Sequence, residues 1–330
     1  MPFWPIVLAP TTALASRIPA LFATPGMVFT MPLLEAVPNV SEGRDAQSIE
    51  AIAETLRGEP GVHLLDLASD PDHHRSVLTA AGEPEPLERG LLALTRAAVE
   101  RIDLRRHTGV HPRLGAVDVV PLVPLPPATM PEAVAVAHDL GRAVGRSLDL
   151  PVFLYGEAAG PGGVRAPADL RRRGLAAVAA ALEAGELVPD YGPRRAHPAA
   201  GVTLIGARTF LVAFNVWLRS SDVRAARAVA RAIRERDGGL PGVQALGLYL
   251  ASRGRAQVSV NLLRPDETPL HRVVECIREE ASARGIELDR GELVGLLPEA
   301  VARGSTAEAL LLPELGPRQI LERRLAEALD

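Results

Sequence analysis

The sequence predicts an α+β protein built from two βαββαβ units. Short apolar segments alternate with amphipathic helical segments, and this order of elements occurs twice along the chain. With 330 residues, 47% of them hydrophobic and 23% charged, the chain is long enough for two modest domains. We therefore expect mixed sheets covered by helices, with a cleft or channel between the two halves.

The first unit begins with an apolar strand at residues 33–37. Asp45 is placed to cap a helix that ends near Leu56, because Ile49, Ile52 and Ala53 recur at helical spacing. Strands at 62–68 and 76–82, a helix at 86–104 and a strand at 114–125 complete this unit. A capping box at Thr129 starts another helix, followed by a strand at 151–156 and an alanine-rich helix at 167–184.

The second unit repeats this order. Residues 202–218 are strand-like, Ser221 or Asp222 caps a helix to about Ile233, and residues 243–250 and 256–263 form a hairpin. A helix at 269–283 and a strand at 286–298 follow. Each unit has the split βαβ order of a ferredoxin-like fold. Helices cover one face of each sheet, so the other faces must be buried, and ligand sites favour such junctions.

This order of elements divides the chain into an N-terminal extension and two subdomains. Residues 1–30 carry one charged side chain, Arg17, and are broken by prolines, so they fit neither a signal peptide nor a membrane span. We expect a poorly ordered extension there, or a start codon assigned too early, with Met31 opening the folded protein. Residues 31–203 then form the first subdomain and residues 204–330 the second.

Composition excludes several classes of chemistry. All 36 basic residues are arginine, so no lysine can form a Schiff base or serve a P-loop. A single cysteine, Cys276, rules out disulfide frameworks within the chain and fits a reducing cytoplasm. The formal charge of -4 and 3% aromatic content predict no nucleic-acid binding, and we expect no membrane association.

The densest polar cluster is the loop at residues 105–119. His107 and His111 are four residues apart, but Gly109 weakens a helix and Pro112 moves His111 out of the α region, so zinc ligation is not favoured. Neighbouring arginines lower the pKa of a histidine and offer seats for carboxylates, which suits a neutral general base. Spacing alone leaves open a basic loop whose histidines are bonded to the backbone.

Three further loops are candidates. Residues 38–45, with Asn39 and Glu42, follow the first strand, where ligand contacts and helix capping are both common. Residues 69–76 carry His73 and His74 directly after Asp70 and Asp72, and a solvated turn is favoured there over a metal cluster. Residues 191–201 join the two halves and either line the cleft or form a plain linker.

Taken together, six motifs resemble the glutamate formimidoyltransferase family, the transferase portion of formimidoyltransferase-cyclodeaminase. They occur in order over residues 33–298 and are VPNVSEGRD (37–45), HTGVHPRLGAVDVVPLVP (107–124), VFLYGEAA (152–159), GARTFLVAFNVWL (206–218), QVSVNLL (257–263) and ELVGLLP (292–298). The cyclodeaminase portion has no counterpart in this sequence.

The resemblance implies transfer of a formimidoyl group from N-formimidoyl-L-glutamate to N5 of tetrahydrofolate, in histidine degradation. It implies a homodimer, a cytoplasmic location, tetrahydrofolate as co-substrate, and no bound cofactor or metal. The family's catalytic histidine corresponds to His111. Its folate-binding loop corresponds to Gly192, Pro193, Arg194, Arg195, Ala196, His197, Pro198, Ala199, Ala200 and Gly201. That loop departs from the family pattern at its arginines and at His197, as Ala68 and His74 do elsewhere.

One imidazole can carry the proton that this reaction must move from N5 to the departing glutamate nitrogen. We therefore expect His111 to be the proton shuttle, with Arg113 and also Arg105 or Arg106 binding carboxylates and Asp118 or Glu42 orienting a partner. The expected substrate-binding residues are Asn39, Glu42, Arg75, His107, Arg113 and Asp118. Formyl transfer from N-formylglutamate, a non-catalytic folate- or anion-binding protein and a metal-dependent hydrolase remain alternatives.

Overall fold

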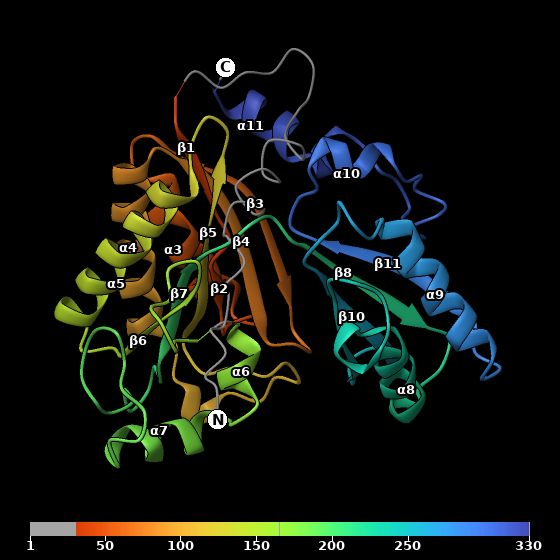
Figure 1. Ribbon diagram of the computed structural model, residues 1–330, viewed down its shortest axis with the longest axis horizontal. Coiled ribbons are helices and arrows are strands. Elements are labelled where there is room, and N and C mark those ends of the chain that lie inside the picture. Colours follow the sequence, from red (N-terminus) through yellow and green to blue (C-terminus); the bar gives the residue numbers. More distant parts are fainter. Residues whose placement is uncertain (1–30, 165, 330) are drawn as a thin grey trace, which may run out of the picture.

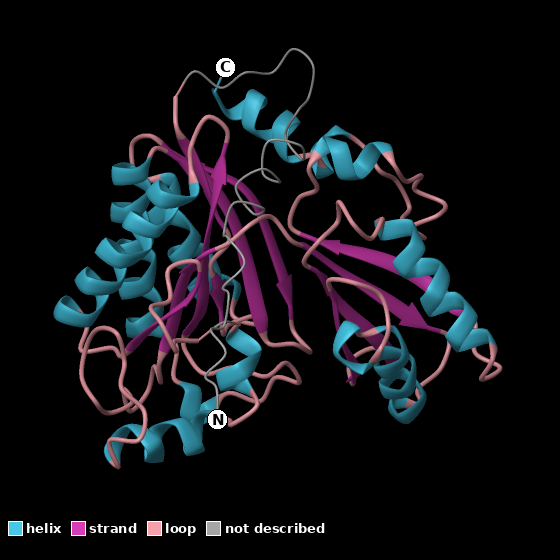
Figure 2. Ribbon diagram, viewed as in Figure 1, coloured by secondary structure: helices cyan, strands magenta, loops and turns pink. Residues whose placement is uncertain are grey.

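Each half of the chain folds into a β-sheet with helices on its outer face, and the inner faces of the two sheets are turned toward each other (Figures 1 and 2). The computed structural model describes residues 31–164 and 166–329, so the expected extension at residues 1–30 lies outside the described residues. The predicted α+β class is confirmed.

The first half contains a seven-stranded sheet. Its elements are β1 (Leu33–Ala36), β2 (Asn39–Val40), α3 (Ala46–Arg57), β3 (Val62–Asp70), β4 (Arg75–Gly82), α4 (Pro84–Arg101), the 3-10 turn η1 (Leu104–Arg106), β5 (Val117–Leu125), α5 (Met130–Ser147), β6 (Val152–Gly156), α6 (Pro167–Arg171), α7 (Leu175–Glu183) and β7 (Thr203–Ala207).

In this sheet β1 lies between β5 and β4, and β3 pairs with the far side of β4, all antiparallel. β2 follows β1 and pairs with the same two neighbours. β7 then adds parallel to β5, and β6 parallel to β7. The first sheet is therefore an antiparallel set extended by two parallel strands.

The second half contains a four-stranded antiparallel sheet in the order β11-β8-β10-β9. Its elements are β8 (Val212–Leu218), α8 (Val223–Ile233), η2 (Glu235–Asp237), β9 (Val243–Leu250), β10 (Arg255–Leu262), α9 (Leu270–Ser282), β11 (Leu288–Val294), α10 (Glu299–Arg303), η3 (Pro317–Gln319) and α11 (Leu321–Leu329). When β1 and β2 are counted as one interrupted strand, the first strand of each half lies between the fourth and the third.

Local sequence explains where the helices begin. The Asp45 side chain accepts a hydrogen bond from the backbone N–H of Gln47, and Asp222 accepts from those of Arg224 and Ala225. Thr129 and Glu132 form the predicted capping box of α5. Each of these helices buries its apolar stripe against a sheet.

Two large cores follow from this packing. One lies under α3, α4 and α5, where Leu56, Leu91 and Leu140 are fully buried. The other lies under α8 and α9, and it also takes in Leu33 and Leu65 from the first half. Arg324 of α11 donates to the Leu65 carbonyl at 3.2 and 3.0 Å, which fastens the last helix to the first sheet.

Three expectations from the sequence are corrected. The helix predicted at 167–184 is two helices, α6 and α7, because Gly174 has φ +76° and interrupts the helical backbone. The strand predicted at 202–218 is two strands in different sheets, since residues 208–211 carry the chain from one to the other. The boundary expected between residues 203 and 204 therefore falls inside β7.

No helix within residues 31–164 or 166–329 combines the length and the apolar character needed to cross a bilayer.

Gly115 tests the packing that holds the loop before β5. A Cβ there would lie 2.1 Å from the Val202 carbonyl oxygen and 2.6 Å from that of Val117, and neither backbone atom can move aside. We expect Gly115→Ala to lower the free energy of unfolding by more than about 2 kcal/mol in urea titrations. Gly160→Ala is the control, because nothing lies within 4 Å of its Cβ. Equal stabilities of the two variants would contradict this packing.

Candidate active site

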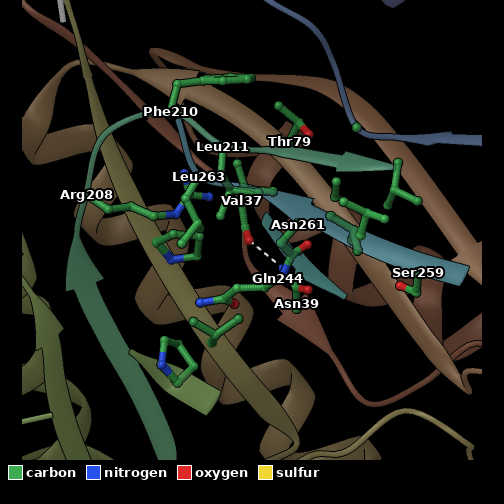
Figure 3. Close-up of a pocket in the computed structure, with 18 of the residues that line it drawn as sticks. Val37, Asn39, Thr79, Arg208, Phe210, Leu211, Gln244, Ser259, Asn261 and Leu263 are labelled. Atoms are coloured by element: carbon green, nitrogen blue, oxygen red, sulfur yellow. Dashed lines mark hydrogen bonds between the residues drawn. The ribbon is translucent and has the colours of Figure 1, made fainter. Parts of the chain in front are cut away.

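A cavity of about 540 Å³ lies between the inner faces of the two sheets (Figure 3). The first sheet contributes Asn39 and Val77 to its wall, and the second contributes Gln244 and Asn261. The helix α6 contributes Arg171. A concave, partly apolar site at a junction is the usual setting for a small ligand.

His111 lies in the loop between η1 and β5, is partly buried and lines this cavity. The ring Nδ1 is 2.7 Å from the carbonyl oxygen of Pro112, which can only accept a hydrogen bond. Arg75 Nη1 is 2.5 Å from Nδ1 and 3.0 Å from Nε2, and a guanidinium can only donate. We assign the ring proton to Nδ1, which then donates to Pro112, and Nε2 accepts from Arg75 over the longer of the two contacts.

The surroundings of His111 disfavour its cationic form. Burial lowers the pKa of His111 well below its usual 6.5, and the positive charges of Arg75 and Arg171 lower it further. The hydrogen bond to Pro112 opposes this shift and does not offset it. The imidazole is therefore neutral at pH 7, as a general base must be.

Two arginines share one buried carboxylate behind His111. Asp118 Oδ2 accepts from Arg75 Nη2 at 3.0 Å and from Arg171 Nη2 at 2.6 Å, while Oδ1 accepts from the Leu114 backbone N–H at 2.7 Å. Burial lowers the pKa of Arg75 to about 10, so its guanidinium still carries a charge at pH 7. Two positive charges against one negative charge leave a net positive site at the cavity wall.

This site has hydrogen-bonding capacity to spare. Within the described residues, the buried Nε atoms of Arg75 and Arg171 have no hydrogen-bond partner. Guanidinium groups bind carboxylates through paired donors. Both arginines line the cavity and are thus placed to receive a carboxylate that enters it.

A chain of side chains joins the two halves beside His111. His73 Nε2 lies 2.9 Å from Gln257 Oε1, and Gln257 Nε2 donates to Glu292 Oε2 at 3.2 Å. Asn215 and Trp217 donate to the same oxygen. The His73 ring stacks on His111 with centroids 5.8 Å apart, so this chain positions the catalytic candidate from the second sheet.

The turn at residues 69–76 is not the solvated turn that the sequence favoured. Asp72 and His73 are buried, and Asp72 accepts from the backbone N–H and hydroxyl of Ser252 at 2.9 and 2.5 Å. Asp72 and His73 are buried because the tip of the β9–β10 hairpin packs on them, while Ser69 and Pro71 are exposed.

Arg113 and Glu42 stabilise loops instead of lining the cavity. Arg113 Nη1 donates to the carbonyls of Gly109 and His111 at 3.0 and 2.9 Å. Glu42 Oε1 accepts from three successive backbone N–H groups, beginning at Gly43. Burial raises the pKa of Glu42, but these hydrogen bonds outweigh it and bring the pKa below its usual value.

His107 is also a loop contact. Its Nε2 lies 2.8 Å from the carbonyl oxygen of His74, and the two rings stack with centroids 4.0 Å apart. Burial lowers the pKa of His107 to about 4, although the hydrogen bond to His74 opposes the shift. The ring is neutral and does not line the cavity.

The segment Gly192–Gly201 lies behind the His111 loop. Gly201 forms an antiparallel bridge with Gly115, and the Ala199 carbonyl accepts from the Leu104 N–H at 2.8 Å. Arg195 pairs with Asp149 at the surface. No residue of this segment lines the cavity.

Of the residues expected from the sequence, His111, Arg75 and Asn39 line the cavity. Asp118 lies directly behind the arginines, and Glu42, His107 and Arg113 hold the surrounding loops. Arg105 pairs with Asp103 at the surface. The sequence did not predict Arg171 as a site residue. Arg171 is the last residue of α6 and lines the cavity.

Among residues 31–164 and 166–329, no three His, Cys, Asp or Glu side chains are grouped so that they could hold a metal ion.

Comparisons with known proteins agree over both halves. Residues 33–208 match the family described as the N-terminal subdomain of the formiminotransferase domain, and residues 213–307 match the formiminotransferase domain. A glutamate formimidoyltransferase of Thermoplasma acidophilum is 38% identical over 90% of this chain and 99% of its own length. One from Streptococcus pyogenes is 37% identical over 89% of this chain and 98% of its own length.

Longer proteins also match. A formimidoyltransferase-cyclodeaminase of Sus scrofa is 42% identical over 81% of this chain, and the match spans 50% of that protein. The chain thus spans about half the length of these two-part relatives.

The neutral state of His111 can be measured by NMR titration. Because burial and two nearby guanidinium groups lower its pKa, we expect its ring signals to titrate with a midpoint well below 6.5. Removing one charge in Arg171→Gln should raise that midpoint, whereas the exposed neighbour Arg172→Gln should not change it. A midpoint at or above 6.5 in the parent protein would refute this electrostatic description.

Proposed function

Because the chain belongs to the formiminotransferase family, we propose that it transfers the formimidoyl group from N-formimidoyl-L-glutamate to N5 of tetrahydrofolate and releases L-glutamate. One observation supports this function best. A neutral imidazole and a pair of arginines line the same cavity between two sheets. The reaction needs a proton shuttle and a seat for an anionic donor, and both are provided there.

His111 is the proton shuttle in this proposal. N5 attacks the amidine carbon of the donor, and the N5 proton passes to Nε2 of His111. The resulting imidazolium then protonates the glutamate nitrogen as the carbon–nitrogen bond to glutamate breaks. The ring returns to its neutral form, and its hydrogen bond from Nδ1 to Pro112 keeps the same nitrogen facing the substrate.

Arg75 and Arg171 bind a carboxylate of the donor. In the assigned tautomer Arg75 donates to Nε2 of His111, which is the atom that must accept the N5 proton. A donor carboxylate competes for this guanidinium and frees Nε2 as it binds. The base is therefore exposed only when the donor is present.

The other expected substrate-binding residues take two kinds of role. Asn39 contacts a substrate directly from the cavity wall. Asp118 positions the two arginines, while Glu42, His107 and Arg113 hold the loops around His111. Their contribution is indirect, because none of them lines the cavity.

Tetrahydrofolate is the co-substrate, and the reaction uses no bound cofactor or metal. We propose that Gly192–Gly201 contacts folate, because the folate-binding loop of the family corresponds to this segment. Its packing behind the His111 loop supports a contact with the folate tail outside the cavity.

We also propose the subdomain fold, the domain boundary, the oligomeric state and the location of the protein. Each half is a ferredoxin-like subdomain in this proposal, since the first strand, with β1 and β2 counted as one, lies between the fourth and the third in both sheets. A boundary after residue 207 keeps β7 with its sheet. The protein acts as a homodimer in the cytoplasm, where Cys276 stays reduced.

The direct test is an activity assay of the full chain with tetrahydrofolate and two donors, N-formimidoylglutamate and N-formylglutamate. Formation of 5-formimidoyltetrahydrofolate from the first donor supports the proposal. Turnover of only the formyl donor, or folate binding without turnover, would replace it with one of the two alternatives.

His111→Ala should lower kcat by about 10²–10⁴-fold, because a general acid-base residue typically contributes this much. His63→Ala is the matched control, since His63 does not line the cavity. Turnover of His111→Ala within about tenfold of the parent would remove this residue from the mechanism.

Arg171→Gln should raise the KM for the formimidoyl donor by about tenfold or more, because a hydrogen-bonded charge at a carboxylate is lost. The KM for tetrahydrofolate should change much less. The adjacent Arg172→Gln, whose side chain is exposed and pairs with Asp169, serves as the control. An unchanged donor KM in Arg171→Gln would exclude the proposed carboxylate seat.

A further inference from the structure

Two arginine side chains stack on one indole at the end of the second sheet. The guanidinium Cζ atoms of Arg253 and Arg290 lie 4.4 and 4.1 Å from the centroid of the Trp217 ring. Trp217 is buried, whereas both arginines are exposed. Attraction between a cation and an aromatic face holds each guanidinium over the ring. We call these three side chains the outer stack.

Strand order brings the two arginines to Trp217 from opposite sides. Arg290 of β11 is the direct partner of Trp217 on β8. Arg253 lies in the β9–β10 hairpin, and β10 is the neighbour of β8 on the other side from β11. Two positive charges are therefore fixed close together across one ring, and a ligand with two carboxylates can contact both.

Neither guanidinium of the outer stack is neutralised by the protein. In the described part of the chain, the side chains of Arg253 and Arg290 make no ion pair and no hydrogen bond. Arg219, at the end of the same sheet, shows the usual alternative, because its Nε lies 3.5 Å from Asp289 Oδ1. The donor N–H groups of the outer stack are thus available to a ligand.

The outer stack lies next to the cavity and outside it. Trp217 Nε1 and Gln257 Nε2 donate to the same oxygen of Glu292, each at 3.2 Å, and Glu292 lines the cavity. Gln257 also contacts His73, whose ring stacks on His111. The outer stack therefore borders the end of the cavity that carries the proposed proton shuttle.

The charge of the whole molecule gives this position a use. The protein has a formal charge of -4, so at long range it repels an anion. The donor of the proposed reaction carries two carboxylates. Unpaired guanidinium groups beside the cavity reverse the sign of the local potential and attract such a molecule to the place where it must enter.

We propose that the outer stack is a second anion site, which binds the carboxylates of the formimidoyl donor before Arg75 and Arg171 receive one of them inside the cavity. This proposal rests on the proposed function. Stacking occupies only the flat faces of the guanidinium groups, so their N–H edges can still bind carboxylates in the paired geometry. The donor then passes from an exposed pair of arginines to a buried pair.

The kinetic test is the double variant Arg253→Gln/Arg290→Gln. Its kcat/KM for the formimidoyl donor should fall by about tenfold at low ionic strength and by less than about twofold in about 0.5 M salt, because salt screens exposed charges. The loss should appear in the donor KM, and the KM for tetrahydrofolate should stay within about twofold. Arg224→Gln/Arg231→Gln is the matched control, since it removes the same charge from the exposed side of α8.

A second measurement detects binding without turnover. Trp4→Phe in every sample leaves Trp217 as the only tryptophan, and its fluorescence reports on the outer stack. The probe is L-glutamate, and Arg171→Gln weakens the inner seat in every sample. A saturable change is expected, with acetate binding about tenfold more weakly because it has one carboxylate. The change should disappear when Arg253→Gln/Arg290→Gln is added. Tighter binding of inorganic phosphate than of glutamate would overturn the assignment to the donor.

The two proposals can fail separately. Absence of formimidoyl transfer by the parent protein would refute the proposed function, while glutamate binding that needs both arginines would still support the outer anion site. Normal transfer with an unchanged donor KM in the double variant at low ionic strength would overturn the outer site alone. A raised KM for tetrahydrofolate in place of the donor would overturn it as well.

Discussion

The candidate active site depends on one shared carboxylate. Asp118 is buried, and its Oδ2 holds both Arg75 and Arg171. Without it, two guanidinium groups would lie together beside a neutral imidazole with no compensating charge, which is costly in a buried site. With it, the cluster keeps one excess positive charge that attracts an anion and also keeps His111 unprotonated. In the proposed function, the same charge serves both binding and catalysis.

The two-sheet architecture explains why these groups can meet. Each sheet hides one face under helices and turns the alternate side chains of its strands toward the other sheet. The inner wall can then be polar at chosen positions without disturbing either core. His73 of the first half and Gln257 of the second connect the sheets beside His111, and the hydrogen bonds continue to Glu292. Next to His73, Asp72 makes a second contact between the halves, with Ser252. The cavity is thus an interface that is held in register by a few polar contacts.

Much of the fold and part of the candidate site were predictable from sequence, and the exceptions have physical causes. The caps at Asp45, Thr129 and Asp222 and the repeated order of elements are local signals. His111, which the family resemblance indicated and the loop alone left open, lines the cavity. Arg171 was missed because an alanine-rich segment gave no sign that α6 ends before Gly174. The burial of His73 was missed because its partner Gln257 is 184 residues away. The apolar run at 202–218 hid a crossing between sheets, since periodicity does not identify which sheet a strand joins.

The pH dependence of kcat/KM for the formimidoyl donor tests the central claim most directly, because it reports the protonation state of the essential base in the free enzyme. A base whose pKa is held well below 6.5 by burial and by Arg75 and Arg171 remains active as the pH falls through 6.5. We therefore expect the rate to stay level from pH 8 to below 6.5 and to decline only at more acidic pH. A decline centred at or above pH 6.5 would contradict the account, because the base would then have an ordinary or raised pKa.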